Sequence, residues 1–335
     1  MPLNRIVTVN RGFVSNKINK SIFSSNDKLS AIGADDIFDI CRDKNGNIYA
    51  TDPVANIIVK ISSDDKVMVW AGQAGVSGNN GGAAVSRGDS LFNGPVGIDV
   101  DEVGNVYVAD SGNNQIRKID TEGRVYVVAG DPDGNSGFTN GVNGLLNAPN
   151  DVVVQMNNIY IADTGNNAVR FIRQGVRGLY TLCGDGSAGD SNGVVGQLNE
   201  PVSLAISKSG NIYINDRGNY KIRKYVADVG LRNFSGTGVR GDAIGKGVSA
   251  QYLDLKFIVA EGDEAVYVVD YDQSTGGRLL RVNADGESYE IKKFDNKPLG
   301  GVCTDYAGQM FVAITDHSDS LYVIGNLVIG LAVIQ

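Results

Sequence analysis

The fold is decided by the stretch Gly104-Asn-Val-Tyr-Val-Ala-Asp-Ser-Gly-Asn-Asn-Gln-Ile-Arg-Lys-Ile-Asp120. Val106 to Ala109 is a short apolar run typical of a buried strand, and the next five residues, Asp110 to Asn114, have the chemistry of a tight turn. Asp and Asn suit a bend because their short side chains bond nearby backbone groups, and Asn and Gly tolerate positive φ. Ile116 to Ile119 begins a returning strand, so the stretch predicts a hairpin.

The same unit recurs along the chain at a nearly constant interval. The first strand of each copy closes on an aspartate, at Asp52, Asp110, Asp163, Asp216, Asp270 and Asp316. Subtraction of successive positions gives spacings of 58, 53, 53, 54 and 46 residues. Repeats of this length, built from strands and glycine-rich turns, indicate a propeller or a solenoid. Six copies predict an all-β, six-bladed β-propeller of four-stranded antiparallel blades.

The connections between blades belong to the repeat as well. Gly- and Asn-rich loops lead to an apolar-Asn-x-Pro sequence that occurs three times, at Phe92-Asn-Gly-Pro95, Leu146-Asn-Ala-Pro149 and Leu198-Asn-Glu-Pro201. Proline fits directly before an inner strand, where its missing N–H costs no ladder hydrogen bond. The loops are therefore expected to follow the blades in a regular way.

We predict two regions, with residues 1–34 as an N-terminal extension of closing strands and residues 35–335 as the propeller. A ring of blades has a seam, and a terminal strand that pairs into the last blade removes an exposed sheet edge. The C-terminal end predicts a hairpin, because a Gly325-Asn326 turn separates two apolar runs. Its last strand, which begins with Leu327, Val328 and Ile329, is expected to complete blade 6; the alternative is edge addition to a neighbouring subunit.

Composition narrows the classes of function. The formal net charge of −8 and the pI of about 4.8 argue against a nucleic-acid partner, since phosphate binding needs a clustered basic face. Three cysteines, Cys41, Cys183 and Cys303, are too few and odd in number for a disulfide framework, so we expect reduced, packed thiols. The first twenty residues lack the apolar core of a signal peptide, and the apolar runs are too short to span a bilayer. We therefore expect a cytoplasmic or virion-associated protein without a membrane span.

These repeats resemble the NHL repeat family, in the variety whose blades read Tyr-Val-Ala-Asp-x-Gly-Asn-x-x-Ile-Arg-Lys. Blade 2 matches most closely and continues to match through Val127-Val-Ala-Gly130 and Asp131-Pro-Asp-Gly134. Blades 3 and 4 match well, blade 1 less so, and blades 5 and 6 mainly in strand rhythm. The resemblance covers about residues 36 to 325 and implies a propeller of four-stranded blades. It does not imply one function, since propellers host catalysis, binding and scaffolding alike.

Polar residues that recur by blade are interpreted as parts of the fold. The repeated Asp and Asn side chains of the turns are expected to form those turns, rather than to surround a central ion. Arg117, Arg170 and Arg223 recur in the third strands, and we assign them to the repeat, because the acidic composition opposes a basic binding face.

No catalytic, cofactor or metal site is predicted. The loop Asp131-Pro-Asp-Gly-Asn135 resembles a calcium loop, but Ser136 and Val142 stand where an EF-hand needs glycine and glutamate, so at most weak calcium binding is expected. His317 is the single histidine; it cannot build a three-histidine zinc site, and a role as general base stays open. Enzymes that resemble this fold include calcium-dependent lactonases and a lyase with a histidine base, so an enzyme of that kind is our alternative function.

The expected function is non-enzymatic binding or scaffolding, as a structural subunit of a larger assembly. A virion is one such assembly, in which the propeller would decorate the particle or contact a receptor or glycan; an intracellular protein-interaction hub differs only in its partner. Arg217 and Tyr220 depart from the turn sequence of blades 2 and 3, and both residue types favour interface cores. The predicted surface contacts are Arg217, Tyr220, Asn113, Asn166, His317, Leu327, Val328 and Ile329.

Overall fold

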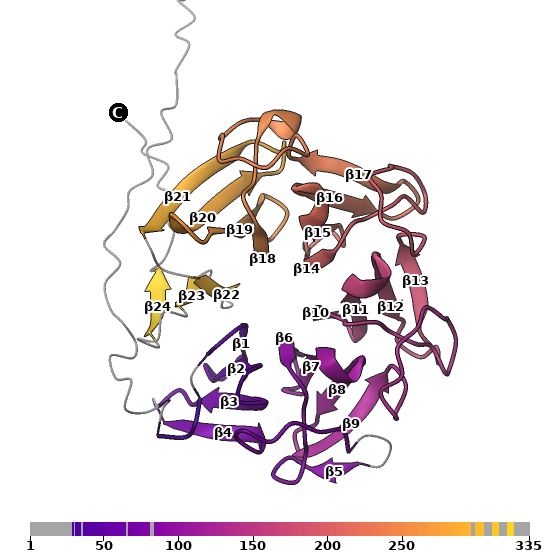
Figure 1. Ribbon diagram of the computed structural model, residues 1–335, viewed down its shortest axis with the longest axis vertical. Helices are drawn as coiled ribbons and strands as arrows, with labels where there is room; N and C mark the ends of the chain where they lie inside the picture. Colours follow the sequence, from indigo (N-terminus) through magenta and orange to yellow (C-terminus); the bar gives the residue numbers. More distant parts are fainter. Residues whose placement is uncertain are drawn as a thin grey trace, which may run out of the picture.

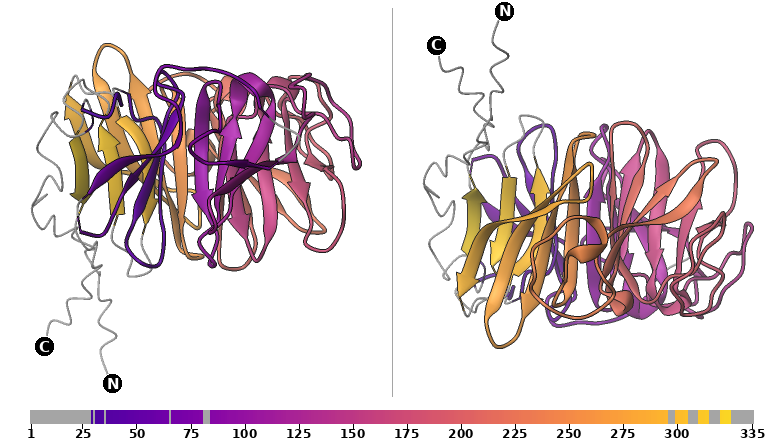
Figure 2. Two further views of the ribbon diagram at one scale, coloured as in Figure 1. Left: turned by 90° about the horizontal axis from the view of Figure 1, so that it is seen from below. Right: turned by 90° about the horizontal axis from the view of Figure 1, so that it is seen from above.

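Antiparallel sheets stand side by side around a central axis in the computed structural model (Figure 1). The structure describes residues 29, 31–34, 36–64, 66–80, 84–295, 299–304, 310–314 and 320–324 of the 335-residue chain. Side views show a short, thick ring (Figure 2). Among these residues, no helix is long and apolar enough to cross a membrane.

Each sheet begins at the axis and runs outward in chain order. Blade 1 contains β1 (Ile40–Arg42), β2 (Ile48–Asp52), β3 (Ile57–Ile61) and β4 (Val67–Gly72). Blade 2 contains β6 (Pro95–Val100), β7 (Val106–Asp110), β8 (Gln115–Ile119) and β9 (Arg124–Ala129), with β5 (Val85–Ser86) as a fifth strand outside β9. Blade 3 contains β10 (Asp151–Gln155), β11 (Asn158–Asp163), β12 (Ala168–Ile172) and β13 (Tyr180–Cys183).

The remaining sheets continue this order. Blade 4 contains β14 (Pro201–Ile206), β15 (Ile212–Asp216), β16 (Lys221–Val226) and β17 (Gly230–Ser235). Blade 5 contains β18 (Leu255–Glu261), β19 (Ala265–Asp272), β20 (Gly276–Asn283) and β21 (Ser288–Asp295). The last sheet contains β22 (Leu299–Thr304), β23 (Met310–Ile314) and β24 (Ser320–Ile324).

The prediction of an all-β propeller with four-stranded antiparallel blades is confirmed for five of the sheets. The prediction of six such blades goes too far, because the last sheet has three strands among the described residues. This sheet is built from the sixth sequence copy, which lacks the Asp-x-Gly-Asn-Asn turn. The closing strands predicted in the N-terminal segment and from Leu327 onward lie outside the described residues.

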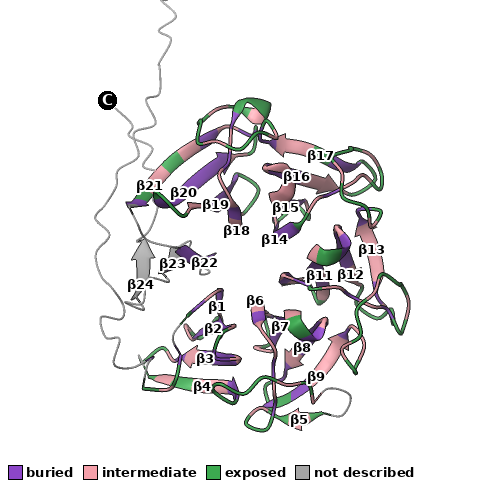
Figure 3. Cartoon of the chain, viewed as in Figure 1, coloured by how far each residue is buried: buried purple, intermediate pink, exposed green. Residues whose placement is uncertain are grey.

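The hydrophobic core lies between neighbouring sheets. Buried residues recur in the strands around the ring (Figure 3). Between blades 1 and 2, for example, Tyr49 and Ile58 pack with Val106 and Ile119. A strand between two such layers is buried on both faces, which explains why all five residues of β7 are buried and why Val106 to Ala109 is continuously apolar. Cys303 and Ala313 of the last sheet share a cluster with residues of blade 1, so the packed layers run around the whole ring.

The hairpin predicted from residues 104–120 is confirmed. A short 3₁₀ helix, η1 (Ser111–Asn113), joins β7 to β8, and Asn114 follows it in the left-handed region with φ 54°. Blades 3 and 4 repeat the arrangement with η2 (Thr164–Asn166) and η3 (Arg217–Asn219).

A buried aspartate in each of blades 2 to 5 binds the loop that enters the blade, and in blades 2 to 4 it also binds this turn. In blade 3, Asp163 Oδ1 accepts the backbone N–H of Asn147 at 2.8 Å, while Oδ2 accepts from Asn166 Nδ2 at 2.8 Å and from Arg170 Nη1 at 2.8 Å. Both charged side chains of the pair are fully buried. Blades 2, 4 and 5 use the pairs Asp110–Arg117, Asp216–Arg223 and Asp270–Arg278. The recurring arginines therefore belong to the fold, as expected, and form no basic face.

In blades 2 and 3, the left-handed asparagine of the turn braces the following blade. Asn114 Oδ1 accepts the N–H of Ala148 at 2.8 Å, and Asn167 Oδ1 accepts the N–H of Glu200 at 3.0 Å. Asparagine suits the position because it tolerates positive φ and also offers an acceptor. The turn residues thus connect blades as well as strands.

Replacing Arg170 with Met is expected to lower the free energy of unfolding by about 3–5 kcal/mol, because the buried carboxylate of Asp163 would lose its counter-ion. Urea unfolding followed by circular dichroism measures the change. Arg124→Met removes the ion pairs with Asp120 and Glu122 from an arginine whose side chain is 58% exposed, and it should cost less than about 1 kcal/mol. Equal losses in the two variants would contradict this account of the buried pair.

Candidate functional site

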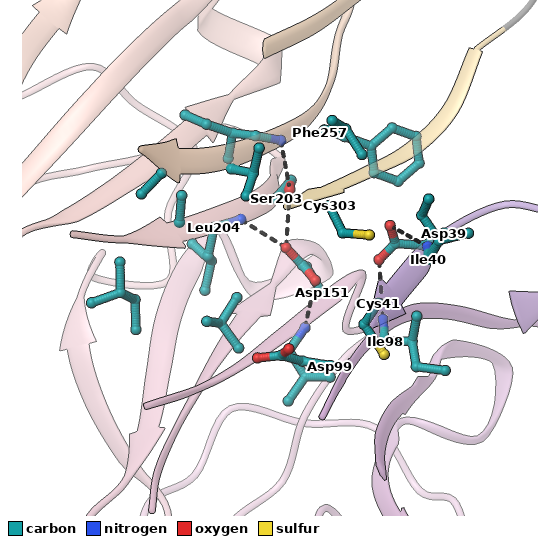
Figure 4. A pocket seen from close by; sticks show the side chains of 18 residues that line it. Asp39, Ile40, Cys41, Ile98, Asp99, Asp151, Ser203, Leu204, Phe257 and Cys303 are labelled. Atoms are coloured by element: carbon teal, nitrogen blue, oxygen red, sulfur yellow. Dashed lines mark hydrogen bonds between the residues drawn. The ribbon is translucent and has the colours of Figure 1, made fainter. Parts of the chain in front are cut away.

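A cavity of about 170 Å³ lies on the axis, where the inner strands of all the sheets meet (Figure 4). Each inner strand contributes one aliphatic side chain at an equivalent position: Ile40, Ile98, Val152, Leu204, Ile258 and Val302. The polar lining is smaller and uneven, and it consists of Asp39, Asp99, Asp151, Ser203, Cys41 and Cys303. All three carboxylates come from blades 1 to 3.

The axial carboxylates link the inner strands of consecutive blades. Asp39 Oδ2 accepts the N–H of Ile98 at 3.1 Å, and Asp99 Oδ2 accepts the N–H of Val154 at 2.7 Å. Asp151 Oδ2 accepts the N–H of Leu204 at 2.8 Å. The polar groups at the axis thus act first as bridges between blades.

Blade 4 continues these bridges without a charge. Ser203 Oγ donates to Asp151 Oδ2 at 3.0 Å and accepts the N–H of Ile258 at 3.2 Å. A hydroxyl group therefore does here what a carboxylate does in blades 1 to 3. In blade 2 the position equivalent to Asp39 and Asp151 is Gly97, where a Cβ would approach the Cα of Asp151 to 2.5 Å.

Burial changes the acidity of these groups. Loss of solvation raises the pKa of Asp99 to about 7 and that of Asp151 to about 6. The pKa of Asp39 lies well above its usual range, first because of burial and second because of the charge of Asp151. Hydrogen bonds from backbone N–H groups favour the ionised forms but do not outweigh desolvation. The site can therefore exchange protons near neutral pH.

All three cysteines are buried, as the sequence predicts. Cys41 and Cys303 face the axial cavity from the inner strands of blade 1 and the last sheet. Burial raises the pKa of the Cys41 thiol well above its usual value and that of Cys183 to about 12. A thiol that stays protonated is a poor nucleophile, so these groups act as packing residues.

In the part of the chain that the structure describes, the side chains that could bind a metal ion do not cluster. In that part of the chain, no three or more His, Cys, Asp or Glu side chains lie together in a way that could hold a metal ion. The three axial carboxylates therefore do not form a metal-binding cluster.

Two of the predicted surface contacts prove to be internal. Asn113 and Asn166 are 6% and 7% exposed. Asn113 Nδ2 donates to Asp110 Oδ2 at 2.9 Å and to the carbonyl of Gly78 at 2.8 Å. The prediction of surface contact was wrong for both residues. The inter-blade loop folds over the turn, and its backbone carbonyls accept hydrogen bonds from the two side-chain amides.

Arg217 and Tyr220 lie at the partly exposed turn of blade 4. Arg217 begins η3, and its side chain, 42% exposed, pairs with Glu200 at 3.6 Å and with Asp254 at 3.4 Å. Tyr220 has φ 50° and occupies the left-handed position that Asn114 and Asn167 hold in blades 2 and 3. The other predicted contacts, His317, Leu327, Val328 and Ile329, lie outside the described residues.

The axial aspartates were missed by the sequence interpretation. Their signal is weak, because each is a single polar residue in or beside an otherwise apolar inner strand, and no two share a motif. Only the ring brings them together, since their positions are 52 to 112 residues apart by subtraction (Asp39, Asp99, Asp151).

The geometry defines the chain as a β-propeller. Residues 92–119 match the family model described as NHL repeat, so the chain contains an NHL repeat, as its sequence suggested.

One curated protein is similar to part of this sequence, and three solved structures are similar to the fold. The protein SUPPRESSOR OF QUENCHING 1 of Arabidopsis thaliana is 33% identical over 129 residues, which is 35% of this chain but only 12% of that protein. A gluconolactonase of Xanthomonas campestris has a TM-score of 0.61 at 14% identity, covering 87% of this chain and 86% of its own. A streptogramin B lyase has a TM-score of 0.56 at 13% identity, covering 88% and 94%. A chain from a nidogen/laminin complex has a TM-score of 0.54 at 15% identity, covering 77% and 80%. These structural likenesses concern the fold alone.

The buried thiols provide a test of the site as described. In the native protein at pH 8, Cys41 and Cys183 should resist iodoacetamide, because burial blocks access and keeps both groups protonated. Mass spectrometry of native and urea-unfolded samples measures the labelling, and all three cysteines should react after unfolding. Rapid native labelling of Cys41 would show instead that the axial cavity is open to reagents and its thiol reactive.

Proposed function

We propose that this chain is a non-enzymatic binding propeller that holds a protein partner on the face formed by the β15–β16 turn and the inter-blade loops beside it. The observation that carries the proposal is Tyr220. A left-handed conformation costs a residue with a Cβ roughly 1–2 kcal/mol, and asparagine reduces this cost by local hydrogen bonding. Tyrosine lacks that compensating hydrogen bond. Its side chain also cannot accept a backbone N–H of the next blade in the way that the side chains of Asn114 and Asn167 do.

Tyr220 and Arg217 lie within a larger patch that spans two blades. Arg217 joins Glu200, from the loop entering blade 4, to Asp254, from the loop entering blade 5. We call these four residues the blade 4 patch. Tyr and Arg are enriched at the energetic centres of protein interfaces, so their joint appearance in place of the turn consensus favours a protein contact.

Exposed apolar side chains lie in the same two loops. Val194 and Val195 in the loop entering blade 4 are 76% and 50% exposed, and Val239, Ile244 and Val248 in the loop entering blade 5 are 60%, 46% and 64% exposed. Exposed apolar side chains in loops are typical of a surface that binds protein. The likeness to a chain from the nidogen/laminin complex also supports a protein as the partner.

We infer further that the last sheet is a sixth blade of the ring. Its inner strand supplies Val302 to the cavity at the position that the other blades fill with aliphatic residues, and Leu299 and Val302 pack against blade 5. A terminal strand, as the sequence predicts, would then complete this blade. The whole ring would act as a rigid subunit within a larger assembly.

Tyr220→Asn together with Arg217→Ser restores the turn type of blade 2. The double variant should be as stable as the wild type or about 1 kcal/mol more stable, and its affinity for the native partner should fall at least about tenfold. Urea unfolding measures the first effect, and quantitative mass spectrometry of cross-linked complexes from the native source measures the second.

Matched variants separate binding from folding. Met156→Asn changes an exposed left-handed residue at the opposite end of the strands and should retain the partner. Fractionation of the native source tests the assembly itself, because co-migration with a particle or complex at fixed stoichiometry supports a subunit role. Migration as a free monomer, or undiminished partner capture by the double variant, would overturn the proposal.

A second candidate is a calcium-dependent hydrolase or lyase that acts at the axis. The observation that favours it is the cavity with Asp99 and Asp151, whose pKa values near neutrality suit proton transfer. The fold likeness to the gluconolactonase and the streptogramin B lyase agrees with this candidate, although it concerns the fold alone.

The binding proposal predicts that lactones and esters are turned over no faster than in buffer, with or without added calcium. A substrate screen with product analysis checks this expectation. Turnover that is abolished by a chelator and reduced at least about 100-fold in Asp99→Asn would establish the enzyme instead.

A further inference from the structure

We propose that one corner of blade 3 is a second protein-binding surface, and that it takes an acidic segment of a partner that also carries apolar side chains. The surface, which we call the blade 3 corner, consists of Val142, Met156, Arg173, Val176 and Arg177, all of them exposed. It lies around the β12–β13 turn, at the opposite end of the strands from the blade 4 patch. The inference does not rest on that patch.

Three exposed apolar side chains mark the corner. Val142, Met156 and Val176 are 72%, 76% and 42% exposed. Met156 also lies in the left-handed region with φ 48°, and Asn157 follows it with φ 60°. A two-residue turn of this kind favours Asn-Gly or Asp-Gly, because both central residues need positive φ. Methionine there combines a backbone cost with an apolar side chain in solvent, and contact with a partner would offset both.

The two arginines of the corner carry charges that the fold does not use. In the part of the chain that the structure describes, neither guanidinium has a carboxylate, a carbonyl or an aromatic ring as its partner. Blade 2 has Asp120 where blade 3 has Arg173, and its Arg124 pairs with Asp120 and Glu122. The corner is therefore a basic and apolar surface on a chain whose formal net charge is −8.

Hydrogen bonds bring the parts of the corner together. Asn158 Oδ1, at the end of the β10–β11 turn, accepts the N–H of Gln174 in the β12–β13 turn at 2.9 Å. Gly141 and Leu179 exchange two backbone hydrogen bonds, at 2.8 and 2.9 Å, so Val142 lies beside the same turn. The corner is thus formed before any partner arrives, which reduces the entropy lost on binding.

Blade 3 also lacks a cation that other blades hold against the sheet. In blades 1, 2 and 4 the third strand places a lysine over the tyrosine ring of the second strand, with Nζ 5.2, 5.5 and 5.1 Å from the ring centre: Lys60, Lys118 and Lys224. Phe171 stands at this position in blade 3 and packs between Tyr160 and Tyr180. The hydroxyl of Tyr180 donates to the carbonyl of Arg177 at 3.3 Å, so the aromatic rings support the turn that carries the two arginines.

The chemistry of the corner decides the class of partner. A guanidinium group can bind a carboxylate through two parallel hydrogen bonds, and arginine is enriched at the energetic centres of protein interfaces. Methionine adapts its shape to an apolar partner. An acidic protein segment with aliphatic side chains matches both parts of the surface. A nucleic acid does not, because two arginines are a small basic surface and the acidic chain repels phosphate.

Peptides selected from a random display library on the full chain test the class of partner. Those whose binding depends on the corner should be rich in Asp and Glu with interspersed Leu, Ile or Val. Their affinity should fall as salt is added, because exposed charges are screened. Corner-dependent peptides that are neutral or basic, or a selection in which no peptide depends on the corner, would overturn the proposal.

Variants of the full chain locate the contact. Arg173→Gln together with Arg177→Gln should weaken binding of these peptides at least about tenfold, because charge-assisted hydrogen bonds are lost. Met156→Asn should weaken it at least about threefold, although asparagine suits the left-handed turn better. Arg124→Gln in the corresponding turn of blade 2 is the matched control and should leave the affinity unchanged. The double variant of the blade 4 patch should also leave it unchanged, so the two surfaces can fail separately.

A measurement on the wild type guards against variants that fail to fold. In hydrogen exchange read by mass spectrometry, a bound peptide should slow exchange in fragments that contain the β12–β13 turn. Protection confined to other blades would contradict the proposal.

Two other occupants would show themselves in sedimentation. Self-association of the full chain that Arg173→Gln with Arg177→Gln abolishes would assign the corner to a second copy. Binding to vesicles of phosphatidylserine and phosphatidylcholine that the same variant abolishes would assign it to a lipid surface. Either result would overturn an acidic protein segment as the partner.

Discussion

The buried pair of aspartate and arginine is the interaction on which blades 2 to 5 depend. Two opposite charges removed from water are stable only if geometry and hydrogen bonds replace the lost solvation. In blade 3, Asp163 meets this demand with donors from the entering loop, the turn and the third strand. Arg170 in turn donates through Nη2 to the carbonyl of Thr139 at 2.6 Å and to Asn140 Oδ1 at 2.7 Å. The pair therefore fixes the loop together with the strands.

This coupling makes the structural unit larger than a blade. Each entering loop also pairs with the outer strand of its blade, through β5 on β9 in blade 2 and through the bridges Gly141–Leu179, Gly193–Leu231 and Lys246–Glu287 in blades 3 to 5. An outer strand without such cover would expose a free edge, which invites pairing with other chains. A loop that leaves one blade thus protects the next, so neighbouring blades stabilise each other as in other repeat proteins.

Features that depend on neighbouring residues, such as turns, could be predicted from the sequence. Features that depend on contacts between blades could not. The hairpin from Val106 to Ile119 was predictable, because Asp, Gly and Asn at a turn have few other uses. The burial of Asn113 was not, since an amide on a turn is usually exposed until a loop from elsewhere covers it. The axial group of Asp39, Asp99 and Asp151 was equally hidden, because the face of a strand that points to the axis depends on blade packing.

Because the chain repeats one unit, equivalent positions in different blades can be compared within the same protein. Asn114, Asn167 and Tyr220 share one backbone conformation. The exchange of asparagine for tyrosine at this position therefore reflects a property of the side chain and not of the backbone. Ala148 and Glu200 also replace a glycine at equivalent left-handed positions, yet each still donates its N–H to the asparagine of the preceding turn. Those two substitutions leave the bracing intact, whereas Tyr220 gives up the bracing acceptor. Under the proposed function, the cost of Tyr220 in its left-handed conformation is explained by a partner that binds the blade 4 patch.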